Sequence, residues 1–159
     1  MQCGGYLHEM SAGGRIGICA GSRIGDPDGG RRRLQLCLPA RPDSIARLRR
    51  AVVEFANGHG ASDRQRDDIA LAVSEALSNA VLHAYVGHAS PGIMRVKACM
   101  HEHWLEVVVS DQGVGMLPRA DSPGLGIGLA LIGRITERLE LESRESIPGL
   151  RVRMTFAIT

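Results

Sequence analysis

Hydrophobic and polar residues follow a regular pattern from about residue 31 onward. Leu34, Leu36 and Leu38 alternate with polar or small residues, which is typical of a half-buried strand, and Pro39 ends this run. Downstream of the capping and first-turn segment Pro42–Ser44, apolar residues recur at spacings of three and four. This spacing predicts a helix that extends to about Ala56, with an apolar face formed by Ile45, Leu48, Val52 and Phe55.

A longer helical pattern covers Asp67–Tyr85. One face of the predicted helix is apolar or small, formed by Ile69, Ala72, Val73, Ala76, Ala80 and Ala84. Glu75, Asn79 and His83 are spaced by four residues, so we expect them along one polar stripe of the same helix.

The remaining patterns alternate between strands and one further helix. Two strand-like runs, Ile93–Met100 and Leu105–Ser110, are joined by a short polar turn and predict an antiparallel hairpin. A glycine-rich segment then leads into a helix that ends near Arg138, and strands follow over Leu139–Ser143 and Leu150–Ile158. This order predicts an α+β two-layer sandwich, in which three helices cover one face of a mixed, mainly antiparallel sheet.

Length and composition divide the 159 residues into two parts. Nine of the 20 glycines fall in residues 1–30, which show no hydrophobic period and cannot bury enough apolar area to offset chain entropy. We interpret this part either as a disordered leader or as an over-extended gene start with the true start at Met10 or later. Residues 31–159 are long enough for one globular domain.

Charge and cysteine usage exclude several function classes. The net charge is only +2 and aromatic residues make up 3% of the chain, which argues against direct binding of nucleic acid. No apolar run approaches the roughly 18 residues that cross a bilayer, and no signal-peptide pattern opens the chain. The four cysteines are scattered without a paired motif. A cytoplasmic protein with reduced thiols, not bound to a membrane, is therefore expected.

The polar stripe of the second helix carries side chains suited to phosphoryl chemistry. A carboxylate such as Glu75 can act as a general base. The amide oxygen of Asn79 is a hard ligand suited to Mg²⁺, which also holds substrate phosphates. Taken alone, such a stripe is more often the solvated face of an amphipathic helix.

Two glycine-containing loops strengthen the interpretation of a binding site. Asp111 ends a buried strand and is followed by Gly113 and Gly115, which allow close approach of a ligand, and its carboxylate can accept a hydrogen bond from an exocyclic amine. Gly124, Gly126 and Gly128 open a helix, whose free amide groups favour a phosphate. Each loop also has a purely structural alternative, which is an ordinary turn for the first loop and turn chemistry or close packing for the second.

The three segments together resemble the GHKL ATPase superfamily of gyrases, MutL proteins and histidine kinases, and most closely its anti-sigma-factor serine kinases. Val73–Tyr85 is similar to the N box of that branch, Asp111–Gly115 to the G1 box, Gly124–Leu129 to the G2 box and Val152–Phe156 to the closing strand. The resemblance covers roughly residues 31–159 and implies the Bergerat ATP-binding fold.

The resemblance also implies a role for each of these residues. Glu75 would be the general base that activates a serine hydroxyl of a partner, Asn79 would hold Mg²⁺, and Asp111 would read the adenine amine. Gly113 and Gly115 would shape the adenine side of the pocket, and His83 would lie close to it, in a binding or a packing role. The phosphates of ATP would lie against the glycines at positions 124, 126 and 128.

The function implied by the resemblance is regulation of a sigma factor. The protein would sequester the sigma factor and phosphorylate a serine of an anti-anti-sigma protein with Mg-ATP, as a homodimer. The cluster Arg47, Arg49 and Arg50 on the first helix offers a docking face for an acidic sigma factor, although such clusters are more often ordinary solvated surface. The alternative is a non-catalytic partner-binding module with a vestigial nucleotide pocket. The short loop Met116–Pro123 and Leu150, which follows Gly149 where relatives commonly carry threonine, favour this alternative.

Overall fold

The computed structural model of the protein describes residues 32–85, 91–113, 125–144 and 147–159. The predicted order of strands and helices is confirmed, whereas the leader (1–30) and the loop Met116–Pro123 lie outside the described residues. The elements in chain order are β1 (Arg33–Pro39), α1 (Pro42–Asn57), α2 (Asp63–Asn79), a π-helical segment η1 (Ala80–Ala84), β2 (Ile93–His101), β3 (Trp104–Ser110), α3 (Leu125–Ile135), β4 (Arg138–Arg144) and β5 (Ile147–Ala157).

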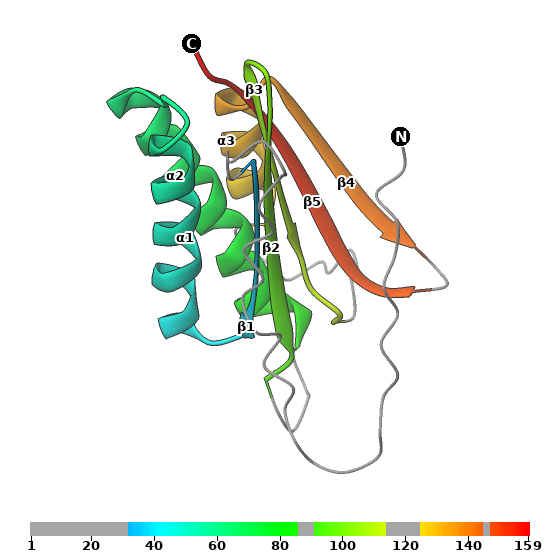
Figure 1. Ribbon diagram of the computed structural model, residues 1–159. Coiled ribbons are helices and arrows are strands. Elements are labelled where there is room, and N and C mark those ends of the chain that lie inside the picture. The colour runs from blue at the N-terminus through cyan, green and yellow to red at the C-terminus, as the bar shows by residue number, and fades with distance from the viewer. Residues whose placement is uncertain (1–31, 86–90, 114–124, 145–146) are drawn as a thin grey trace.

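The five strands form one sheet in the order β1-β2-β3-β5-β4. Every neighbouring pair is antiparallel, so the described sheet is not mixed but fully antiparallel. Figure 1 shows that α1, α2 and α3 lie together on one face of the sheet, which confirms the predicted two-layer α+β architecture.

The core lies between the sheet and the helices. Leu105, Val107 and Val109 of β3 are buried at alternate positions, and their register partners Val152, Met154 and Phe156 on β5 are buried as well. Because successive side chains of a strand point to opposite faces, a slip of one residue would expose this whole set. The buried face of α2, including Ile69 and Val73, packs into the same cluster.

Helix α2 begins at Asp63, four residues before the predicted start. The side chain of Ser62 accepts a hydrogen bond from the backbone N–H of Gln65, and the Gln65 side chain accepts one from the Ser62 N–H, which is a capping box. Gln65 also donates its side-chain amide to the carbonyl of Ala157 at 2.7 Å. These bonds fix the start of α2 against the end of β5.

Helix α3 ends at Ile135, before the predicted end at Arg138. The Thr136 hydroxyl donates to the Ile132 carbonyl, and the Glu137 N–H donates to Thr155 of β5, so the chain leaves the helix and joins the sheet there. Within the described ranges, no helix combines the length and apolar character that are needed to cross a membrane.

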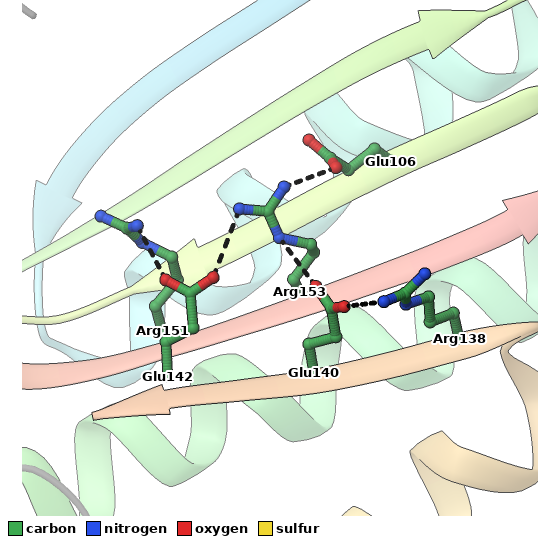
Figure 2. A network of polar contacts seen from close by, with 6 residues as sticks. All are labelled: Glu106, Arg138, Glu140, Glu142, Arg151 and Arg153. Atoms are coloured by element: carbon green, nitrogen blue, oxygen red, sulfur yellow. Dashed lines mark hydrogen bonds and ion pairs between the residues drawn. The ribbon is translucent and has the colours of Figure 1, made fainter. Parts of the chain in front are cut away.

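The face of the sheet opposite the helices carries a network of ion pairs centred on Arg153. Its guanidinium donates to Glu106 at 2.7 Å and lies 3.3 Å from a carboxylate oxygen of Glu140 (Figure 2). The hydrogen bond to Glu106 is the main cause that raises the pKa of Arg153, so this cation stays charged. The network joins β3, β4 and β5 and consists of Glu106, Arg138, Glu140, Glu142, Arg151 and Arg153.

We expect the central and the peripheral arginine of this network to differ in their effect on stability. Arg153→Met removes the shared partner of three glutamates and should lower the free energy of unfolding by about 1 kcal/mol. Arg138, whose side chain is 72% exposed, contacts only Glu140 among these carboxylates, so Arg138→Met should change stability by less than about 0.5 kcal/mol. Urea unfolding of both variants at low and high salt measures the difference, and equal losses would contradict the central role of Arg153.

Candidate functional site

Glu75 and Asn79 lie one turn apart in the regular part of α2, as the spacing predicted. Both side chains are half-buried, while their neighbours Ala76 and Leu77 pack into the core. Neither side chain has a hydrogen bond or ion pair to another described residue. The Glu75 carboxylate and the Asn79 amide therefore belong to adjacent turns on one stripe of the helix.

The regular spacing ends at Asn79, because the chain continues as the π-helical segment η1. A π-helix closes i→i+5 hydrogen bonds, so side chains four residues apart no longer lie on one line as they do in the preceding α-helix. His83 lies in η1 and is half-buried, but the geometry does not continue the line from Glu75 through Asn79. The role predicted for His83 stays a prediction.

Gly128 of α3 lies directly against the side chain of Glu75. A Cβ atom built on Gly128 would be 1.9 Å from Oε1 and 2.5 Å from Cδ of Glu75. No real Cβ occurs at such distances, so a side chain at position 128 would displace the carboxylate. The structure therefore brings together two residues that the sequence analysis had placed in separate motifs.

Asp111 follows the last residue of β3, and two backbone amides hold its carboxylate. Its Oδ1 accepts hydrogen bonds from the N–H of Gly113 at 2.9 Å and from the N–H of Leu150 at 3.3 Å. Burial raises the pKa of the Asp111 carboxyl, and these two bonds offset part of the increase. Because Leu150 acts through its backbone, a threonine side chain is not required for this bond.

The loop after Asp111 packs closely on the end of η1. A Cβ atom on Gly113 would lie 1.9 Å from the carbonyl oxygen of Ala84, so only glycine allows this approach. Gly126 lies in the first turn of α3. Gly115 and Gly124 lie outside the described residues.

Gly149 and Tyr85 also support this site, although the sequence analysis did not single them out as site residues. Gly149 of β5 has φ +118°, and a Cβ atom there would lie 2.1 Å from the carbonyl oxygen of Asp111. The hydroxyl of Tyr85, just after η1, accepts a hydrogen bond from the N–H of Gln112 at 2.9 Å. The sequence did contain a signal for Gly149, because a glycine that follows Pro148 between two strand patterns indicates a special backbone conformation. The contact of Tyr85 is evident only from the fold.

We expect Gly149→Ala to destabilise the protein by about 3 kcal/mol, because it adds a steric clash with Asp111 to an unfavourable φ. The matched control is Gly60→Ala, where φ is +90° but nothing lies within 4 Å of the added Cβ, so that only about 1 kcal/mol should be lost. Urea unfolding measures both variants. Equal losses would show that the close approach of β5 to Asp111 does not contribute.

The described part of the site has acceptor groups spread along one helical run. Asp111 is a partly buried acceptor at one end of the α2–η1 run, and Glu75 and Asn79 supply oxygen atoms along it. Glu75 and Ala84, which contacts the Asp111 loop, are separated by nine residues, or roughly 13 Å along a helix. Oxygen donors suit Mg²⁺, and the glycine backbones at positions 113 and 128 leave no space for side chains.

The chain resembles a known family of proteins in sequence and in fold. Residues 38–156 match the family model described as "Histidine kinase-like ATPase domain". The chain is 27% identical over 138 residues to the serine-protein kinase RsbW of Bacillus pumilus, covering 77% of this chain and 83% of that one. It is also 27% identical over 137 residues to the anti-sigma F factor of Clostridium novyi, covering 79% and 93% of the two chains.

Other relatives are matched over only part of their length. The serine-protein kinase RsbW of Bacillus licheniformis is 36% identical over 80 residues, which span 50% of each chain. A solved structure of the RsbU and RsbW domains of a Mycobacterium tuberculosis protein superposes with a TM-score of 0.63 at 23% identity, covering 79% of this chain and 32% of that one, and shows the same fold. The relatives fit the anti-sigma-factor branch inferred from the motifs, and the chain belongs to the histidine kinase-like ATPase family.

Proposed function

We propose that this protein is an ATP-dependent serine kinase that sequesters a sigma factor and phosphorylates an anti-anti-sigma protein. The observation that supports it most is the run α2–η1, which carries Glu75 and Asn79 in the last turns of α2 and holds the Asp111 loop at the end of η1. In this proposal the adenine amine donates to Asp111, and the phosphates extend along the helix toward Asn79. The names of the relatives, serine-protein kinase and anti-sigma F factor, support the same function.

The proposed reaction is transfer of the γ-phosphoryl group to a serine hydroxyl. Glu75 accepts the hydroxyl proton, the serine oxygen forms a bond to the γ-phosphorus, and the bond from that phosphorus to the bridging oxygen breaks, so that ADP leaves. Mg²⁺ bound with ATP would be held by the Asn79 amide oxygen and would neutralise phosphate charge. Gly128 keeps the Glu75 carboxylate in place because α3 packs against it without a side chain.

The proposed sigma-factor surface is one that carries negative charge. Arg47 and Arg50 are exposed on α1, which suits an acidic patch of a sigma factor. A homodimer is part of the same proposal. Both proposals are tested by mixing the protein with sigma factors of the source genome and measuring the molar mass of each species by light scattering after size exclusion. The mass of the protein alone tests the dimer, and the mass of the mixture tests the complex with the sigma factor.

Calorimetric titration of ATP, with and without Mg²⁺, tests the nucleotide site. We expect saturable binding by the wild-type protein, loss of the Mg²⁺ dependence in Asn79→Ala, and binding at least about tenfold weaker in Asp111→Asn, whose NH₂ group cannot accept from the adenine amine. Asn57→Ala, at the exposed end of α1, is the matched control. Absence of binding by the wild-type protein would refute the proposed function.

The Asp111→Asn variant, although we expect it to bind ATP more weakly, should be more stable than the wild-type protein. Because burial raises the pKa of Asp111, the folded protein binds this proton more tightly than the unfolded chain. The free energy of unfolding therefore decreases as the pH rises from the ordinary carboxyl pKa through the folded one, and the penalty is complete above it. Asp111→Asn removes this penalty, so at neutral pH the ATP-free variant should unfold at higher urea concentration than the wild-type protein.

A further inference from the structure

Tyr85 connects the end of η1 with the start of β2 and with the loop that follows β3. Its hydroxyl accepts a hydrogen bond from the N–H of Gln112 at 2.9 Å and donates one to the carbonyl of Ile93 at 2.8 Å. Its ring fills the space beside Gly92, where an added Cβ would lie 1.8 Å from Cε1 of the ring. One side chain at the end of η1 thus holds both the start of β2 and the loop that follows β3.

The loop held by Tyr85 is the one that carries Asp111. Gln112 is the residue between Asp111 and Gly113, and the Asp111 carboxylate itself accepts the N–H of Gly113. Two consecutive backbone N–H groups therefore have fixed acceptors, one on Tyr85 and one on Asp111. Burial raises the pKa of Tyr85, which keeps its hydroxyl protonated and able to donate to Ile93 at neutral pH.

We propose that Tyr85 is a positioning residue for base recognition, which holds the Asp111 loop so that the carboxylate selects a purine with an exocyclic amine. The inference rests on the proposed nucleotide site. If the hydroxyl is removed, the Gln112 N–H loses its acceptor and the turn between Asp111 and Gly113 can relax. A carboxylate that moves by a fraction of a hydrogen-bond length discriminates less well between an amine and a carbonyl on the purine ring.

The test compares two nucleotides that differ at position 6 of the purine ring and therefore also in whether N1 carries a hydrogen. ATP carries a 6-amino group, whereas inosine triphosphate carries a 6-carbonyl that a carboxylate repels. We expect the wild-type protein to prefer ATP, and Tyr85→Phe, which keeps the ring, to reduce the ratio of the two affinities by about tenfold. The matched control Thr136→Val removes a hydroxyl at the far end of α3, where it donates to Ile132, and should leave the ratio unchanged.

A second variant keeps the hydroxyl and displaces the ring. Gly92→Ala would place a methyl group where the Tyr85 ring lies, so we expect it to lower the affinity ratio as Tyr85→Phe does, and it decides the matter if Tyr85→Phe does not fold. If the variants only lose stability, the affinities for ATP and for inosine triphosphate should fall equally and their ratio should stay unchanged. That result would overturn the positioning role of Tyr85. If the wild-type protein prefers ATP and the variants keep the full preference, the role of Tyr85 is refuted while the proposed function stands. A wild-type protein that binds neither nucleotide refutes the proposed function and this inference with it.

Discussion

Glu75→Gln is expected to lower phosphate transfer to the anti-anti-sigma protein by about a thousandfold while ATP still binds with nearly wild-type affinity. The glutamine side chain has almost the same shape as glutamate, so its packing against Gly128 is retained. What it lacks is the carboxylate that accepts the serine proton in the proposed reaction. The measurement is transfer of labelled phosphate from ATP to the purified partner, together with calorimetric titration of ATP into the same preparation.

The control for this experiment is Glu54→Gln, an exposed glutamate on α1. It removes one negative charge and should leave both transfer and ATP binding unchanged. If Glu75→Gln transfers phosphate as fast as the wild-type protein, Glu75 is not the base. If the wild-type protein binds ATP but labels no partner, the alternative of a non-catalytic binding module gains support.

The local elements of the fold could be predicted from the sequence because their signals are local. The alternation of Leu34, Leu36 and Leu38 and the helical spacing around Glu75 and Asn79 each depend on neighbours within a few residues. The start of α2 at Asp63 is also encoded locally, in the Ser62–Gln65 capping box, whereas the spacing of apolar residues alone predicts a start four residues later. The change to π-helical geometry at Ala80 has no comparably clear sequence signal.

The contacts that shape the site could not be predicted in the same way. Gly128 meets Glu75 because α3 packs on α2, and Gly149 meets Asp111 because β5 pairs with β3, so both contacts join residues far apart in the chain. A glycine pattern alone does not distinguish a phosphate-binding loop from close packing. For Gly128 the structure favours the second explanation, since its missing side chain leaves room for a carboxylate.

This close packing makes Gly128 a second position at which we expect phosphate transfer to be sensitive to substitution. Gly128→Ala would place a Cβ atom 1.9 Å from Oε1 of Glu75, so either the carboxylate or helix α3 must move. A displacement of about 1 Å at a reacting group can reduce a rate by about a hundredfold, and we expect phosphate transfer to fall by that factor. Phosphate transfer and urea unfolding are measured together, so that a loss of transfer is not confused with unfolding.

Helix α3 supplies its own control at Gly133, where an added Cβ would meet only Leu139 at an ordinary 3.7 Å. Because alanine favours a helix more than glycine does, Gly133→Ala should raise the free energy of unfolding by about 0.5–1 kcal/mol and leave transfer unchanged. The two variants make the same chemical change in one helix and differ in what the new methyl group meets. If both leave transfer intact, contact between α3 and the Glu75 carboxylate is not needed for catalysis. If Gly128→Ala alone loses transfer and stays folded, the position of that carboxylate controls the reaction.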